Sequence, residues 1–147
     1  MQLPSHLIVG IFIQMIIEEQ QSWPRAWQIV AICSLALFSH FVLDTLALLT
    51  YHPPTPCPDD RIWLSWHLIV FSGGGFLLFL FWQKYWLGMI AANFIDIWDW
   101  GGLRLLKKIK HDPDWGQQWT IHSYLQKFRA PLKKYLPDLT EKHLAIV

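Results

Sequence analysis

Cysteine is scarce in this chain of 147 residues, which holds only Cys33 and Cys57. The first lies in an apolar stretch and the second in a proline-rich one, and no CxxC pair occurs, so no disulfide framework is implied. The chain also lacks a Walker loop, a GxGxxG sequence and a GxSxG sequence. The usual sequence signals for nucleotide binding and for serine hydrolases are therefore missing.

Charge is sparse as well. Charged residues make up 16% of the chain, against about 25% in a typical soluble domain, and 53% of the residues are hydrophobic. The formal net charge is only +1 and no recognition motif accompanies the basic residues, so we expect no nucleic-acid partner. The composition instead indicates a single membrane-embedded domain.

Four apolar segments follow one another, over residues 7–17, 27–50, 62–82 and 85–100. The second and third reach the ~20 residues that a helix needs to cross hydrocarbon. The first is shorter and spans only if its helix extends from about Pro4 to Gln21. We predict an all-α integral membrane bundle of about four transmembrane helices in residues 1–104, followed by a juxtamembrane tail in residues 105–147.

The flanks of these segments suit a membrane protein. No Lys or Arg precedes Leu7 and no small-residue cleavage site follows Ile17, so we do not expect a cleaved leader. Tryptophans lie near the proposed span ends, where an indole can act as an interface anchor; they are Trp23, Trp27, Trp63, Trp66, Trp82, Trp86, Trp98 and Trp100. The run Gly73-Gly74-Gly75 is expected to let two helices approach closely.

Basic residues set the expected orientation. Nine of the twelve Lys and Arg residues lie from Arg104 onward. The positive-inside rule then predicts that the tail, and with four crossings the N-terminus too, faces the cytoplasm of a bacterial-type inner membrane or a thylakoid-like membrane. The tail mixes cations with aromatic residues, so we expect a partly amphipathic collar on anionic lipid headgroups.

Ionisable side chains in or beside the apolar segments are the functional lead, because such groups are costly at membrane depth and usually face a bundle interior. They are His6, His40, Asp44, His67, Asp96, Asp99 and His122. In an up-and-down bundle with short loops, neighbouring helices run antiparallel. We therefore expect the first six to gather at one end of the bundle.

Spacing supports a ligand set. His40 and Asp44 are four residues apart, and Asn93, Asp96 and Asp99 follow one another at intervals of three. Imidazoles mixed with carboxylates suit Zn²⁺, Mn²⁺ or Fe²⁺ better than Ca²⁺. We expect metal ligands among His6, His40, Asp44, His67, Asp96 and His122.

Structural interpretations stay open for some of these residues. A lone histidine such as His67 is often a hydrogen-bonded structural residue, and Asp99 is compatible with a solvated position at the interface. His6 is compatible with an interfacial place at a helix start, with Ser5 as the N-cap.

These residues resemble the membrane-bound metal-dependent hydrolase family, whose members are also described as LexA-binding, inner-membrane-associated hydrolases. The opening Leu3-Pro4-Ser5-His6-Leu7-Ile8-Val9-Gly10 is similar to the family's N-terminal segment, and Ser39-His40-Phe41-Val42-Leu43-Asp44 is similar to its SHxxLD helix. Two looser similarities are Asp96-Ile97-Trp98-Asp99, for a PDxD turn without its proline, and Thr120-Ile121-His122-Ser123, for a THS segment downstream of His111. The SHxxLD helix precedes the other two here, whereas family members place it last.

The resemblance implies a metal-assisted hydrolase in which His6, His40, Asp44, Asp96 and His122 correspond to the motif residues. A divalent metal near one leaflet could act on a lipid phosphate or a lipid ester, with Asp99 as catalytic base or as the residue that orients a histidine. A second hypothesis is a non-enzymatic subunit of a larger membrane-protein complex, in which His40 and His67 ligate haem or a pigment. A third is a small structural or assembly protein without a site.

Overall fold

The computed structural model describes residues 3–46, 61–112, 114–116 and 119–133, and every regular element among these residues is a helix. In chain order the elements are α1 (Leu3–Glu18), α2 (Arg25–Leu46), α3 (Arg61–Asp96), the π-helix η2 (Ile97–Gly102), α4 (Leu103–Lys110) and α5 (Ile121–Lys133). The predicted all-α class is confirmed for this part of the chain. Cys57 lies outside the described residues.

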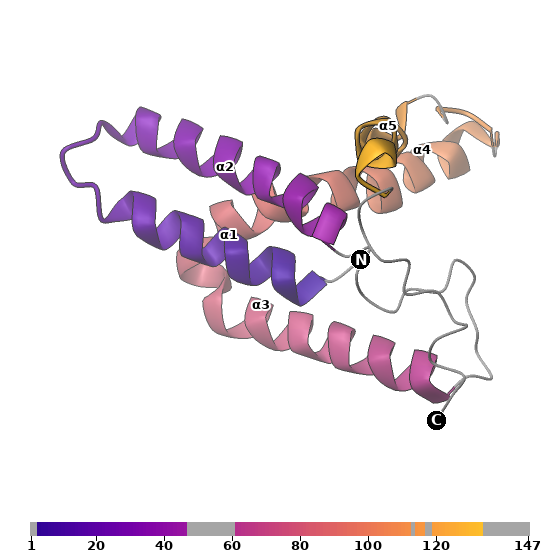
Figure 1. The fold of residues 1–147 in the computed structure, drawn as a ribbon, viewed down its shortest axis with the longest axis horizontal. Coiled ribbons are helices and arrows are strands. Elements are labelled where there is room, and N and C mark those ends of the chain that lie inside the picture. Colours follow the sequence, from indigo (N-terminus) through magenta and orange to yellow (C-terminus); the bar gives the residue numbers. More distant parts are fainter. Residues whose placement is uncertain (1–2, 47–60, 113, 117–118, 134–147) are drawn as a thin grey trace.

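Helices α1, α2 and α3 form a bundle in which α1 packs against both of its neighbours (Figure 1). Pro24 precedes α2, where the N–H that a proline lacks would have no helical partner. The start of α1 and the end of α2 lie at one end of the bundle, and the turn that joins them lies at the other (Figure 1). The bundle therefore has a turn end and an opposite end that collects residues from several helices.

The third and fourth apolar segments, expected as two separate spans, form one bent helix. Tyr85 within α3 has φ −119° and ψ 24°, outside the helical region. Figure 1 shows α3 running toward the turn end, bending there and coming back toward η2 and α4. The two halves of α3 thus run in opposite directions without an intervening loop.

A buried glutamine fills the bend. Gln14 Nε2 donates to the carbonyl oxygen of Lys84 (3.2 Å), and Gln14 Oε1 accepts from the N–H of Gly88 (2.8 Å). In an unbroken helix that N–H and that carbonyl would bond to each other, because they are four residues apart. An inserted side chain is one of the established causes of a sharp kink. Gln14 of α1 therefore replaces the helical bond that the bend in α3 breaks.

Glycines bring α1 and the second half of α3 into backbone contact. A β-carbon placed on Gly10 would collide with the backbone carbonyl of Gly88, and the reverse substitution would collide with that of Gly10. The expected close approach at the glycine run is found at Gly74, where a β-carbon would meet the side chain of Leu3 at 2.5 Å. Gly75 has nothing within 4 Å. The tightest helix contact thus uses an isolated glycine pair.

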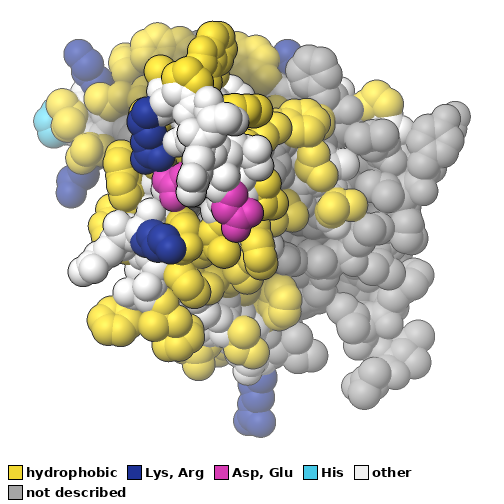
Figure 2. All heavy atoms as spheres, turned by 90° about the vertical axis from the view of Figure 1, so that its left-hand side faces the viewer, with side chains coloured by type: hydrophobic (Ala, Val, Ile, Leu, Met, Phe, Trp, Pro, Cys, Tyr) yellow, Lys and Arg dark blue, Asp and Glu magenta, His cyan; other side chains and the backbone are white. Residues whose placement is uncertain are grey.

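The distribution of polarity is the reverse of that in a soluble protein. Large apolar side chains lie outside, such as Phe79 at 85% exposure and Leu68 at 69%, while Gln14, His40 and Asn93 are buried. Figure 2, which looks onto the turn end, shows hydrophobic side chains surrounding a small group of acidic and basic ones. Soluble proteins keep charged and amide groups at the surface and rarely expose large apolar patches.

Two helical stretches are long and apolar enough, by length and composition, to cross a membrane: Arg25–Leu46 and Leu64–Lys110. Only 22% and 11% of their most apolar windows are buried inside the protein, unlike the core helix of a soluble domain. The helix Leu3–Glu18 is apolar but shorter.

Candidate metal centre

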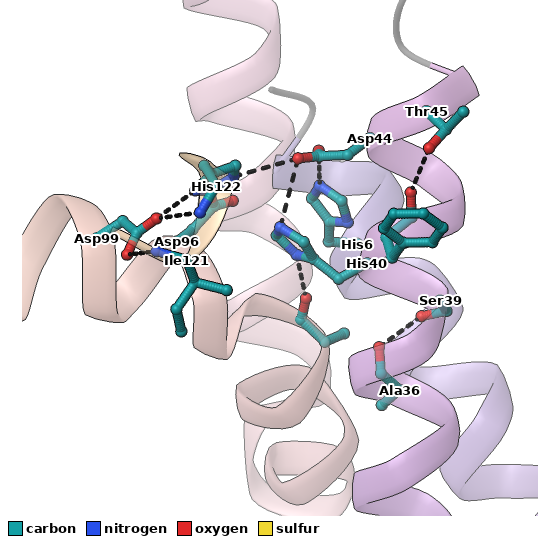
Figure 3. A network of polar contacts seen from close by, with 12 residues as sticks. His6, Ala36, Ser39, His40, Asp44, Thr45, Asp96, Asp99, Ile121 and His122 are labelled. Carbon is teal, nitrogen blue, oxygen red and sulfur yellow. Dashed lines mark hydrogen bonds and ion pairs between the residues drawn. The ribbon is translucent and has the colours of Figure 1, made fainter. Parts of the chain in front are cut away.

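Six of the seven predicted residues meet at the end of the bundle opposite the turn (Figure 3). We call five of them the polar cluster: His6 of α1, His40 and Asp44 of α2, Asp96 of α3 and His122 of α5. The sixth, Asp99 of η2, lies behind His122. Antiparallel helices bring these residues together, because α1 starts, α2 ends and α3 ends at this level.

Asp44 is the centre of the contacts. Its Oδ1 lies 3.3 Å from His6 Nε2, and its Oδ2 lies 3.6 Å from His40 Nε2 and 3.2 Å from His122 Nε2. His122 Nε2 also lies 3.4 Å from Asp96 Oδ1. Charge-assisted hydrogen bonds between nitrogen and a carboxylate are shorter, about 2.7–2.9 Å. These four separations are therefore longer than optimal hydrogen bonds.

His40 is held in one orientation by the backbone. Its Nδ1 lies 2.7 Å from the carbonyl oxygen of Ala92, and since a carbonyl can only accept, Nδ1 carries the proton. The other nitrogen, Nε2, then presents a bare lone pair toward Asp44. The imidazole is fully buried and its ring stacks on that of His6, with centroids 4.1 Å apart and planes 14° apart.

Asp99 orients His122. Its Oδ2 accepts from His122 Nδ1 at 2.7 Å and from the backbone N–H of His122 at 2.8 Å, while Oδ1 accepts from the backbone N–H of Ile121 at 2.9 Å. The same carboxylate thus caps the first turn of α5 and fixes the imidazole tautomer. Of the two roles expected for Asp99, this geometry favours orientation over action as a base, because both oxygens are already acceptors.

Three buried groups of the cluster have no hydrogen-bond partner among the described residues. Both carboxylate oxygens of Asp96, Nδ1 of His6 and Nε2 of His40 are in this state. Leaving a buried carboxylate without a donor costs far more than leaving a neutral group unpaired. His6, His40 and Asp96 each offer one ligand atom within 4.8 Å of the others, so a cation among the three could partner buried groups of this kind.

The pKa of His122, the most exposed residue of the polar cluster, indicates an excess of negative charge around it. A hydrogen bond to Asp44 is the largest influence on the pKa of the His122 imidazole and raises it, and the bond to Asp99 raises it further. Desolvation opposes the shift. The side chain of His122 is 20% exposed, the most open of the five in the cluster. The cluster therefore attracts positive charge, and its open edge lies at α5.

Donor spacing fits a single coordination sphere. His6, His40 and Asp96 offer ligand atoms within 4.8 Å of one another, and so do His40, Asp44 and His122. Donors bound to one Zn²⁺ at about 2.0–2.1 Å in a tetrahedron lie about 3.3 Å apart, close to the 3.2–3.6 Å measured around Asp44. The cluster could hold a metal ion. His40 belongs to both triplets, and its one free lone pair can bind only a single ion.

His67 is not part of either triplet, so its prediction as a ligand is not supported by the structure. Gly73 and Gly74 of α3 lie beside Pro4 and Leu3, at the first turn of α1. His67 comes six residues before Gly73, which places it about 9 Å further along the helix at ~1.5 Å per residue, beyond the level of His6. Its ring lies 6.3 Å from that of Phe71.

The sequence did not identify the backbone groups that orient the polar cluster or the side chain that stabilises the bend in α3. The carbonyl of Ala92 and the N–H of Ile121 are backbone atoms, which leave no signal in the residue type. Gln14 does leave one, since it is a lone amide inside the apolar run 7–17. An amide is not ionisable, so Gln14 is not among the residues expected to bind a metal.

No protein-family model, curated protein or solved structure matches the chain. The resemblance to the membrane-bound hydrolase family therefore stays a prediction that rests on the motif residues.

Proposed function

We propose that this protein is an integral membrane protein that binds one divalent transition-metal ion in the polar cluster and uses it for hydrolysis at headgroup depth. Zn²⁺, Mn²⁺ and Fe²⁺ are the candidate ions, because imidazole and carboxylate ligands suit all three. The observation that carries the proposal is the buried Asp96 carboxylate, which has no hydrogen-bond donor among the described residues and faces three imidazoles.

The orienting bonds support a metal centre further. Metal-bound histidines nearly always donate their second nitrogen to a carboxylate or a backbone carbonyl. His122 donates Nδ1 to Asp99 and His40 donates Nδ1 to Ala92, so each directs Nε2 into the cluster. Neither orientation is required if the histidines merely fill space.

The membrane location is supported by the inverted polarity and by the bent α3. Both halves of α3 are apolar outside, so the helix would cross twice and α1 and α2 once each. Both termini then lie on one side, which the concentration of Lys and Arg from Arg104 onward assigns to the cytoplasm. The polar cluster would lie just inside that leaflet.

Hydrolysis needs access for substrate and water, and the His122 edge would provide it. A bound divalent ion polarises a phosphoryl or acyl oxygen and lowers the pKa of water. The substrate class that fits a site beneath headgroups is a lipid phosphate or a lipid ester. Haem binding is a poorer fit, because His40 is fully buried against His6 and Asp44 and lacks an open face for a macrocycle.

The test measures lipid hydrolysis by the full chain in nanodiscs of phosphatidylcholine that contain phosphatidic acid or diacylglycerol. Protein stripped by a chelator should release neither phosphate nor fatty acid, and reloading with Zn²⁺, Mn²⁺ or Fe²⁺ should restore release. Asp44→Asn should lose metal and turnover together, while Glu19→Gln, an exposed carboxylate at the turn end, should keep both. Metal binding without turnover on any of these lipids would contradict the hydrolase assignment.

A further inference from the structure

The basic helix α4 follows the candidate metal centre directly. It continues from η2 without a break and begins seven residues after Asp96, which places its start about 10 Å further along at ~1.5 Å per residue. In Figure 1, α4 extends away from the bundle, beyond the start of α1. If the polar cluster lies just inside a leaflet, α4 lies at the headgroups of that leaflet.

Helix α4 carries two different faces. Four of its eight residues are cationic and none is acidic: Arg104, Lys107, Lys108 and Lys110. Arg104 and Lys108 are four residues apart and share one face, while Leu105 and Ile109, also four apart, share another. Leu105 is 59% exposed and Ile109 is 60% exposed. An exposed apolar face beside an exposed basic face is characteristic of helices at a membrane surface.

The cations of α4 have no acidic partner within the described residues, where the ion pairs involve only histidines and Arg25 on the basic side. The guanidinium of Arg104 lies 4.5 Å from the ring centre of Trp100, which is itself 50% exposed. Such pairs of a cation with an indole suit the headgroup region. Among the residues that the structure describes, nothing acidic occupies the basic face, which suits an anionic ligand.

The helix dipole explains only part of this arrangement of charged and apolar residues. Lysines in the last turn of a helix complement its dipole, and Lys107, Lys108 and Lys110 occupy that turn. This effect does not explain why Leu105 and Ile109 remain uncovered, nor why Arg104 lies in the first turn. A charged bilayer surface accounts for all of them, because it offers phosphate to the basic face and acyl chains to the apolar face.

We propose that α4 is a binding surface for anionic phospholipids. Arg104 and Lys108 contact headgroup phosphates, and Leu105 and Ile109 contact acyl chains. This inference rests on the proposed membrane location, and it deepens the proposed function by naming an anionic headgroup as the group concentrated at the open edge of the polar cluster.

The test compares amide hydrogen exchange of residues 103–110 in the full-length protein, in nanodiscs of phosphatidylcholine alone and with phosphatidylglycerol. Lipids bearing phosphatidylglycerol should slow exchange about fivefold for each lysine engaged, and the effect should shrink in 1 M salt, where the Debye length falls to about 3 Å. A variant carrying Arg104→Gln and Lys108→Gln should lose the difference.

Two matched variants sharpen the result. Lys108→Gln should weaken the response to phosphatidylglycerol, and Lys84→Gln, an exposed lysine at the bend of α3, should leave it intact. Equal exchange in the two lipids would overturn the proposal, as would an equal loss from Lys84→Gln. Protection seen only in native membranes would point to a protein partner and would overturn it too.

Metal content measured on the same samples separates the two proposals. Protein that stays metal-free after equilibration with Zn²⁺, Mn²⁺ and Fe²⁺, yet still responds to phosphatidylglycerol, would refute the metal centre and support the lipid surface. Metal-loaded protein without a response to phosphatidylglycerol would support the metal centre and refute the lipid surface.

Discussion

Each imidazole of the polar cluster is oriented by a different neighbour. His40 is fixed by a backbone carbonyl, His122 by the carboxylate of Asp99, and His6 by stacking on the ring of His40. The His40–Asp44 pair is visible in the sequence because a spacing of four places both side chains on one helix face. The carbonyl that orients His40 is not visible, because a backbone atom leaves no signal in the residue type. Asp99 was expected as a residue that could orient a histidine, but the sequence did not show which one.

Asp99→Asn tests the orienting role at this scale. The amide keeps one acceptor oxygen and loses the charge, so His122 should be held less firmly and metal affinity should fall by about 10–100-fold, the range for such outer partners. Affinity would be measured by competition with a chelator, and the d–d spectrum of Co²⁺-loaded protein would report the ligand field. An Asp112→Asn control, which removes an exposed carboxylate, should leave both unchanged. Unaltered affinity and spectrum in Asp99→Asn would exclude the orienting role.

At the level of elements, the bend in α3 is what the sequence concealed. Hydropathy locates the apolar segments, and the antiparallel order of helices follows from short connections, so the meeting of residues at one end could be anticipated. The position of each residue along the bundle axis could not be anticipated, because it depends on where α3 bends and how far its first half extends past α1. The position of His67, which lies outside both groups of candidate ligands, depends on this geometry.

Gln14→Leu tests how the bend is stabilised. The change leaves the N–H of Gly88 and the carbonyl of Lys84 unpaired, and each buried unpaired group costs about 1–3 kcal/mol. Unfolding of the purified protein in mixed detergent should therefore shift to lower denaturing-detergent fractions. Gln21→Leu, at an exposed position in the turn between α1 and α2, serves as the control. Equal stability of the two variants would contradict the role given to Gln14.

Glycine substitutions test the helix contact that sets the level of the cluster. Gly10→Ala should destabilise the fold by about 1–3 kcal/mol, the usual cost of overpacking, because the new methyl group meets the backbone of α3. Gly75→Ala meets nothing within 4 Å and should change stability by less than about 1 kcal/mol. Thermal unfolding in detergent measures both. A Gly10→Ala variant as stable as Gly75→Ala would mean that the two helices are not in contact there.

For the whole molecule, the exposed apolar surface and the reversal within α3 are the two features on which the proposed membrane topology rests. Apolar surface outside and amide and ionisable groups inside are what a lipid environment favours. The low charged fraction of 16% indicates membrane association from composition alone, and the structure contributes two helical stretches long and apolar enough to cross a membrane. His122 was expected as a ligand from its motif residues, but how α5 brings it back to the bundle could not be predicted, because that depends on the turn between α4 and α5.

Cysteine labelling tests the topology. In a chain with Cys33 and Cys57 replaced by serine, single cysteines at exposed positions 61 and 110 should react with an impermeant maleimide from the same side. A cysteine at position 21 should react from the opposite side. If α3 and α4 instead made one crossing, positions 61 and 110 would be labelled from opposite sides.

The central claim is that His6, His40, Asp44, Asp96 and His122 jointly hold one cation. Elemental analysis of the full-length protein, purified in mild detergent and equilibrated in turn with Zn²⁺, Mn²⁺ and Fe²⁺, tests it most directly. We expect one tightly retained ion per chain in wild type and none in Asp96→Asn. Wild-type protein that retains none of the three ions, or Asp96→Asn protein that retains as much as wild type, would contradict it.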